Sequence, residues 1–161
     1  MITTYFDNAS TTPVDRRVIE KMRACLGADG TYGNPAANTH SFGWMASEEV
    51  EWSRAMVAET IGADPREIVW TSGATESDNL AIRGLLEGMA DSTGRHKIIT
   101  METEHKAVLD TCAHLSDAEV VYLRPESDGL LSLDSLAKVL DDSVLLVSAM
   151  LVNNETGGIQ P

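Results

Sequence analysis

Three short polar segments of this chain carry residue types that could bind an anion and move protons. The first is residues 71–77, with the sequence TSGATES, which directly follow the apolar run 68–70. A glycine turn between a β-type run and a helix-permissive stretch describes a strand that ends at a helix N-terminus. Such a terminus exposes unpaired N–H groups and the positive end of the helix dipole, so it suits a phosphate group. The segment matches neither the dinucleotide-binding pattern nor the P-loop pattern.

The same spacing has a simpler interpretation, which the segment alone favours. Thr75 could cap the following helix, with Asp78 three residues further on as its partner in a capping box. Two other segments change this weighting, because His105 and the pair Asn153-Asn154 each follow a predicted strand. Each signal is weak alone, since a histidine after a strand often starts a helix and an Asn-Asn pair often makes a turn. Their shared place at the strand ends favours a functional site.

The elements that must position these residues alternate along the second half of the chain. Apolar runs predict strands, and stretches between them predict helices. Such alternation predicts an α/β fold with a parallel sheet and right-handed crossovers. Ligands of such sheets bind beyond the carboxyl ends of the strands. The predicted strands are 68–71, 97–101, 119–123 and 144–150, and the predicted helices are 75–89, 106–116 and 133–141.

The first part of the chain has a different pattern. Residues 1–12 are predicted to be extended with a polar turn, and a helix is predicted to begin near Pro13. A loop rich in Gly, Asn and Pro spans residues 27–38. A long helix is then predicted, with apolar residues from Ala46 to Ile61 at helical spacing and charged residues including Arg54 facing water. Gly62 is predicted to end it.

Composition limits the class of protein. A chain of 161 residues with 43% hydrophobic residues can form one globular domain, and a net charge of −13 argues against a nucleic-acid partner. No apolar stretch approaches the ~18 residues that would span a membrane, and no signal peptide is recognisable. Cys25 and Cys112 form neither a metal-binding spacing nor a disulfide framework, so we predict no metal site. A cytoplasmic location follows by default.

Taken together, the polar segments resemble those of a known family. The chain resembles, almost from end to end and in order, the N-terminal part of a cysteine desulfurase, a pyridoxal-phosphate enzyme of the class V aminotransferase group. The longest matches look more like the branch of iron–sulfur cluster assembly than like kynureninase or serine aminotransferases. The matching segments are residues 7–13, 33–35 with His40, 71–79, 103–110 and 152–155.

The resemblance implies a role for each site residue. Ala74 and Thr75 would hold the phosphate of pyridoxal 5′-phosphate through backbone N–H groups and the Thr75 hydroxyl. His105 would stack on the pyridine ring and act as a catalytic residue that moves protons. Asn154 would donate a hydrogen bond to the ring hydroxyl and also meet the substrate carboxylate. Asn34 would lie near the substrate.

The resemblance also implies what this chain would comprise. Residues 15–161 would form the N-terminal half of the large domain of a fold-type I pyridoxal-phosphate transferase, and residues 1–14 would reach toward a small domain. The lysine that bonds the cofactor, the aspartate that pairs with its pyridinium nitrogen and the mobile cysteine that receives sulfur are not found in this sequence. Lys106 would be solvated at a helix start, and neither Cys25 nor Cys112 would carry a persulfide, because both are predicted to lie on helices.

The expected function follows from the resemblance. The complete enzyme would convert L-cysteine to L-alanine, leave a persulfide on its own cysteine, and pass sulfur to an iron–sulfur scaffold protein or to tRNA thiolation. It would be a homodimer. Two alternatives are a non-catalytic module, from a truncated or split enzyme that associates with a complementary C-terminal fragment, and another class V enzyme such as a selenocysteine lyase.

The resemblance further predicts that residues 1–161 do not form a self-sufficient domain. The three later strands would be contiguous, whereas the strand at 68–71 would have no neighbour within this chain. Its backbone groups would lack partners, and apolar surface would be exposed. The isolated chain is therefore expected to aggregate or to pair with a C-terminal segment.

Overall fold

The computed structural model describes residues 4–161. The chain divides into two compact units, one ending at Trp70 and the other running from Thr71 to Pro161. We call them the N-terminal unit and the C-terminal unit, and describe each separately.

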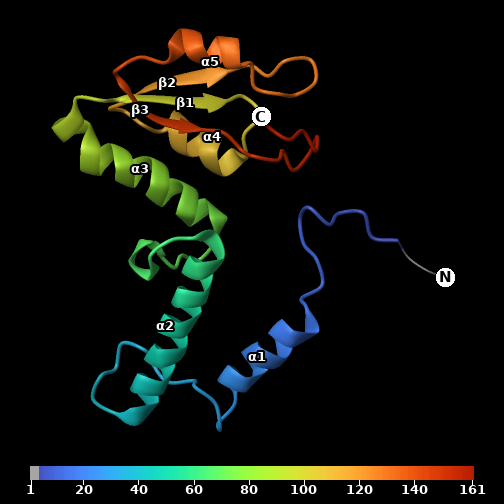
Figure 1. Cartoon of the computed structure of the whole chain (residues 1–161), viewed down its shortest axis with the longest axis vertical. Helices are drawn as coiled ribbons and strands as arrows, with labels where there is room; N and C mark the ends of the chain where they lie inside the picture. The colour runs from blue at the N-terminus through green and yellow to red at the C-terminus, as the bar shows by residue number, and fades with distance from the viewer. Residues whose placement is uncertain (1–3) are drawn as a thin grey trace. The chain divides into compact units, whose positions relative to one another are not determined.

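The N-terminal unit consists of helices and loops (Figure 1). Helix α1 spans Arg16–Leu26, α2 spans Ser41–Ile61, and the 3-10 helix η1 spans Pro65–Glu67. The α1 helix begins at the cap Asp15, whose carboxylate accepts the Arg17 N–H at 2.8 Å, rather than at Pro13. The α2 helix ends at Gly62, as predicted. Its φ of 70° is the left-handed conformation that glycine adopts without strain.

Few side chains of the N-terminal unit are buried. The buried residues of α2 are Gly43, Ala46 and Ala58, and none of the residues of α1, all of which the structure describes, is buried. One sequence prediction is wrong here, since the Arg54 side chain is only 20% exposed. Its guanidinium donates to the Ile68 carbonyl at 2.5 Å and lies over the Trp70 ring.

The C-terminal unit is built on a parallel sheet of three strands in the order β2-β1-β3. Strands β1 (Lys97–Met101) and β2 (Glu119–Leu123) have the predicted bounds. Strand β3 (Val144–Ser148) ends two residues before the predicted limit. The parallel α/β architecture and the contiguity of these strands are therefore confirmed.

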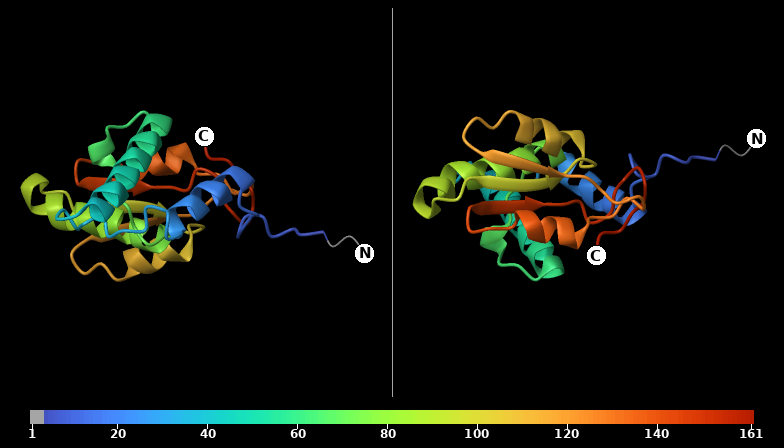
Figure 2. Two further views of the ribbon diagram at one scale, coloured as in Figure 1. Left: turned by 90° about the horizontal axis from the view of Figure 1, so that it is seen from below. Right: turned by 90° about the horizontal axis from the view of Figure 1, so that it is seen from above.

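Helices cover both faces of this sheet. The helices are α3 (Ala74–Thr93), α4 (Lys106–Ala113) and α5 (Leu133–Val139). Figure 1 shows α5 on one side of the strands and α4 on the other, and the sheet is seen from two further directions in Figure 2. This follows from right-handed crossovers, because the chain moves from β1 outward to β2 and then back past β1 to β3.

Apolar side chains from strand β1 and from helices α3 and α4 form the core. Ile98 of β1 packs with Ile82 of α3 and with Val108 and Cys112 of α4. Ile99, which points to the opposite face because side chains alternate along a strand, is also fully buried. The central position of β1 explains why both faces of this strand are covered.

Residues 68–71 are not a strand, which corrects one prediction, whereas the prediction that they have no sheet neighbour within this chain is confirmed. These residues form no sheet pairing, although Ile68 has extended dihedral angles of −90° and 121°. A strand is defined by the hydrogen bonds of a ladder, so an apolar β-type run becomes one only where a neighbour exists. Within residues 4–161 no helix is both long and apolar enough to cross a membrane.

Candidate functional site

The first predicted site segment forms the N-terminus of α3. Gly73 is the cap residue, and no side chain of the described residues bonds to the terminus in the manner of a cap. Ala74 and Thr75 are the first two residues of the helix, so the interpretation of Thr75 as the cap is wrong. The N–H groups of a first turn have no partner within the helix, and here they remain available to an anion.

The loop before α3 is held by its own side chains. The Glu76 carboxylate accepts the Ser72 N–H at 2.7 Å and the Ser72 hydroxyl at 2.6 Å. Both bonds lower the pKa of Glu76, and the bond from the Ser72 hydroxyl has the larger effect. The Thr71 and Ser77 hydroxyls lie 2.7 Å apart. The loop is therefore shaped without using the N–H groups of Ala74 and Thr75.

The second segment places His105 as the cap of α4. Its Nδ1 accepts the Ala107 N–H at 3.1 Å, and the residue is exposed. The helix-start interpretation of this histidine is thus confirmed, and it also has a chemical consequence. Because Nδ1 accepts, the neutral ring carries its proton on Nε2, and the ring is held in one orientation.

The third segment follows β3 and contains Asn153 and Asn154, which differ in burial. Asn154 is exposed, whereas Asn153 is 8% exposed. The Asn153 Nδ2 donates to the Thr103 carbonyl at 2.9 Å, and its Oδ1 accepts the N–H groups of Glu155 and Thr156. Asn153 therefore ties the end of β3 to the end of β1.

Glu104 makes the reciprocal connection. Its Oε1 accepts the Met150 N–H at 2.6 Å, and it is 9% exposed. Burial raises the pKa of this carboxyl, the Met150 N–H lowers it by less, and Asp78 of α3 raises it further. Helix α3 packs against α4 and β3, the elements next to these two residues.

The structure thus brings four of the five predicted site residues to one edge of the C-terminal unit. Ala74, Thr75, His105 and Asn154 lie at the α3 N-terminus and at the carboxyl ends of β1 and β3. Asn34 belongs to the N-terminal unit, where its Oδ1 accepts the Ala36 N–H at 2.9 Å.

Sequence reasoning gave no role to Glu104 or Asn153, although both lie in the segments that it singled out. A signal was present in the type of residue, because a carboxylate and an amide directly after apolar strands are candidates for burial with a hydrogen-bond partner. Which member of each polar pair is buried could not be predicted.

The predicted locations of Lys106 at a helix start and of Cys25 and Cys112 on helices are confirmed. The Lys106 side chain is 82% exposed and lies 3.9 Å from Asp110 one turn along α4. Cys112 is in the core, where burial raises the pKa of its thiol, and Cys25 lies on α1. Neither cysteine lies on a mobile loop.

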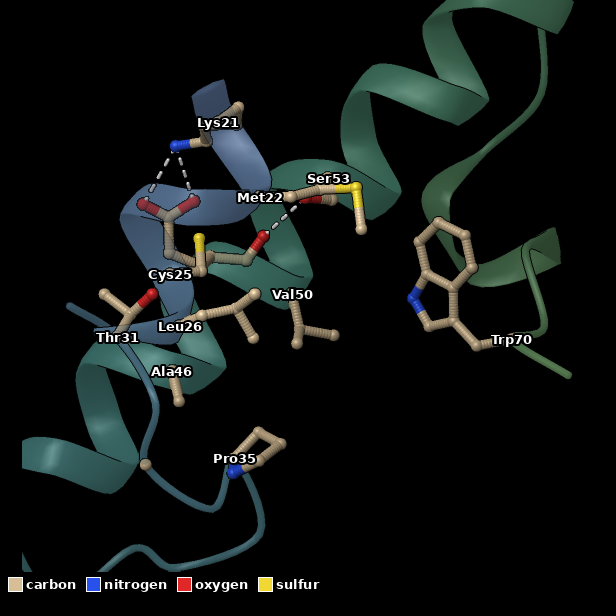
Figure 3. Close-up of a pocket in the computed structure, with 12 residues that line it drawn as sticks. Lys21, Met22, Cys25, Leu26, Thr31, Pro35, Ala46, Val50, Ser53 and Trp70 are labelled. Atoms are coloured by element: carbon tan, nitrogen blue, oxygen red, sulfur yellow. Dashed lines mark hydrogen bonds and ion pairs between the residues drawn. The ribbon is translucent and has the colours of Figure 1, made fainter. Parts of the chain in front are cut away.

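The N-terminal unit contains a separate cavity of about 620 Å³ between α1, α2 and the loop that joins them. Figure 3 shows Met22, Leu26, Val50 and Trp70 around it and Lys21 bonded to a carboxylate. That carboxylate belongs to Glu49, at 2.9 Å. The lining is mostly apolar and presents no set of groups suited to a phosphate.

A family model of class V aminotransferases matches residues 4–161. The chain belongs to the class V aminotransferase family. It is 54% identical over 158 residues to a protein of Proteus mirabilis named cysteine desulfurase IscS, and 55% identical to that of Serratia proteamaculans. In each case the match covers 97% of this chain and 39% of the relative, so the chain spans about two fifths of their length.

Solved structures agree with this family. A NifS-like protein superposes with a TM-score of 0.91 at 41% identity, covering 99% of this chain and 43% of the other. A structure titled SspA in complex with cysteine gives 0.87 at 38% identity, covering 99% and 45%. DndA from Streptomyces lividans gives 0.81 at 44% identity, covering 98% and 44%. The predicted fold class is confirmed.

Proposed function

We propose that this chain is the N-terminal part of the large domain of a pyridoxal-phosphate-dependent cysteine desulfurase, and that Ala74, Thr75, His105 and Asn154 form part of its cofactor site. The observation that carries the proposal is the convergence of an uncapped helix N-terminus, a fixed imidazole and an exposed amide at one sheet edge. The identity of 54% to 55% with relatives named cysteine desulfurase supports the choice of reaction.

The α3 N-terminus fits the phosphate of this cofactor. Its first-turn N–H groups have no side-chain cap among the described residues, and Glu76, the acidic residue of that turn, is bonded to Ser72. The positive end of the helix dipole adds attraction for a dianion. Ala74 and Thr75 would bind the phosphate through their N–H groups, and the Thr75 hydroxyl would donate a further charge-assisted bond.

His105 and Asn154 fit the ring portion of the cofactor. When bound, pyridoxal phosphate supplies an electron sink for the bonds of the substrate α-carbon. His105 would cover the ring face, with Nε2 available to hold or transfer a proton while Nδ1 remains on the Ala107 N–H. Asn154 would orient the ring by a side-chain hydrogen bond to its hydroxyl and help to bind the substrate carboxylate. Asn34 is proposed to contribute to the substrate side.

The complete protein would need groups that these 161 residues do not supply. Of the four lysines, Lys21, Lys97 and Lys106 are each within 4.0 Å of a carboxylate. None sits in the Ser-x-His-Lys setting that the family resemblance implies for the cofactor-bonding lysine; Lys106 follows His105, but threonine stands at position 103. We therefore expect residues 1–161 alone to release neither alanine nor sulfide from L-cysteine. Turnover by this chain similar to that of a full-length desulfurase would contradict the proposal.

Cofactor binding provides the direct test. In the full-length or reconstituted protein, Thr75→Ala should raise the Kd of pyridoxal phosphate about tenfold, because one charge-assisted hydrogen bond is lost. Thr93→Ala is the matched control, since Thr93 ends the same helix, far from its N-terminus, and its hydroxyl donates to the Met89 carbonyl at 2.7 Å and accepts the Arg95 N–H at 3.3 Å. An equal Kd for both variants and the unchanged chain would remove Thr75 from the site.

The remaining expectations extend the proposal. The complete protein is proposed to be a cytoplasmic homodimer that uses L-cysteine and passes sulfur to an acceptor such as an iron–sulfur scaffold protein. A selenocysteine lyase would use the same cofactor edge, and comparing L-cysteine with L-selenocysteine as substrates of the complete protein separates the two activities.

A further inference from the structure

Two side-chain hydrogen bonds continue the connection between β1 and β3 beyond the point where their backbone pairing ends. The last backbone pair of the ladder is Thr100 with Ser148. Further on, Glu104 of the β1 side accepts the Met150 N–H, and Asn153 of the β3 side donates to the Thr103 carbonyl. Each side of the connection thus supplies one side chain and one backbone group.

Burial makes these bonds costly to lose. Glu104 and Asn153 are 9% and 8% exposed, so removing a partner would leave a desolvated polar group unpaired. Asn153 also orders the turn after it, because its Oδ1 accepts the N–H groups of Glu155 and Thr156 at 3.0 and 2.9 Å. We call this pair of reciprocal bonds the Glu104–Asn153 clamp.

Each of the two clamp residues immediately precedes an exposed site residue in the sequence. His105 follows Glu104, and Asn154 follows Asn153, so each exposed side chain is attached to a buried, bonded neighbour. Helix α3, which begins at Ala74, packs against α4 and β3, and these two elements border the clamp. The clamp itself joins the two segments that carry His105 and Asn154.

We propose that Glu104 and Asn153 are positioning residues that fix His105 and Asn154 relative to each other through the clamp. They act through their neighbours and do not touch the cofactor. The link to pyridoxal phosphate rests on the proposed function, whereas the clamp itself is a property of this chain. Geometry rather than charge is the essential feature, since the Glu104 carboxylate acts as an acceptor for an N–H.

Amide hydrogen exchange of the 161-residue chain without cofactor tests the clamp. In Glu104→Ala, the amides of Met150 and of Ala107, which donates to His105, should exchange about tenfold faster through local opening. Glu104→Gln keeps an acceptor oxygen and should retain exchange within about twofold of the unchanged chain. Glu102→Ala is the matched control, because Glu102 follows the same strand but bonds only the exposed Arg124.

Cofactor affinity then tests positioning in a way that a general loss of stability would not imitate. Glu104→Ala should weaken pyridoxal phosphate binding about tenfold when His105 is present, and should have little effect in a His105→Ala chain, because coupled residues are non-additive. Asn153→Ala should show the same dependence on Asn154. Equal weakening with and without the exposed partner would overturn the positioning role.

The outcomes separate the two proposals. Unchanged exchange of Met150 and Ala107 in Glu104→Ala would overturn the clamp, whether or not the cofactor binds. If exchange in Glu104→Gln were as fast as in Glu104→Ala, the clamp would also be overturned. The charge of Glu104, rather than its geometry as an acceptor, would then hold the segments. A complete or reconstituted protein that binds no pyridoxal phosphate would overturn the proposed function, and the exchange of Ala107 would still decide whether the clamp positions His105.

Discussion

The two units of this chain use their apolar residues in opposite ways. In the C-terminal unit, Ile98 and Ile99 on adjacent positions of β1 are both fully buried, one toward each face of the sheet. In the N-terminal unit, Leu26 of α1 and Trp44 of α2 are 77% and 57% exposed. The sequence pattern of both regions is amphipathic, but the C-terminal unit buries large apolar side chains, whereas the buried residues of α2 are small.

This difference shows that a helical pattern marks which face would be buried, without supplying the surface that buries it. The C-terminal unit has its own partners because strands β1, β2 and β3 and the helices between them are consecutive in the sequence. The N-terminal unit exposes a set of large apolar residues that includes Val18, Met22, Phe42 and Ile61. The aggregation or pairing of an isolated 161-residue chain stays a prediction, which size-exclusion chromatography can test.

The largest expected difference between the units lies in hydrogen exchange. Amides of β1, the central strand, should exchange about a thousandfold more slowly than those of α1, because α1 opens without exposing a core. Exchange of the 161-residue chain followed by mass spectrometry measures both segments in one sample. Similar protection of α1 and β1 would mean that α1 is covered in solution by a surface that the N-terminal unit itself does not provide.

Matched substitutions of large apolar residues sharpen the comparison. Ile98→Ala should lower the free energy of unfolding by about 2–5 kcal/mol, because it opens a cavity between β1, α3 and α4. Leu26→Ala should change it by less than about 0.5 kcal/mol, because the side chain is exposed. Chemical denaturation followed by circular dichroism measures both, and a larger loss for Leu26→Ala would break the comparison.

Tryptophan fluorescence can follow the N-terminal unit alone, since Trp44, Trp52 and Trp70 are the three tryptophans of the chain and all belong to that unit. In the same denaturation, Ile98→Ala should shift the circular dichroism transition of the sheet. A fluorescence transition that shifts by the same amount would show that the units unfold together.

The smallest expected effect concerns an ion pair at the start of β1. Lys97 and Ser143 hold the pKa of Asp141 at about 2, below its ordinary value. A lowered carboxyl pKa stabilises the fold above the unfolded value of about 3.9, and this stabilisation is lost as the pH falls toward 2. Asp141→Asn should therefore reduce the pH dependence of stability between about pH 4 and pH 2, measured by acid denaturation.

Asp142→Asn is the control for this substitution, because it removes a neighbouring charge without removing the bond to Lys97. An equal reduction in both variants would assign the effect to net charge, which is −13 for the chain, rather than to the ion pair.

The sequence by itself determined the local elements and the segments of the site. The alternation of apolar runs and helical stretches predicted β1 and β2 with their observed bounds, because strand and helix periodicities differ and the turns between them are marked by polar residues. The same pattern located the segments that contain Thr75, His105 and Asn154. Gly62 as the end of α2 was also predictable, since a left-handed cap favours glycine.

Only the tertiary structure decided which of these local preferences are realised. The run at 68–71 has the composition of a strand and is none, because a ladder needs a neighbour that no local pattern supplies. Burial likewise separated Asn153 from Asn154 and Glu104 from His105, since adjacent polar residues look alike in sequence. The hydrogen bonds of the clamp join residues 46 and 50 positions apart, so they exist only once β1 and β3 are side by side.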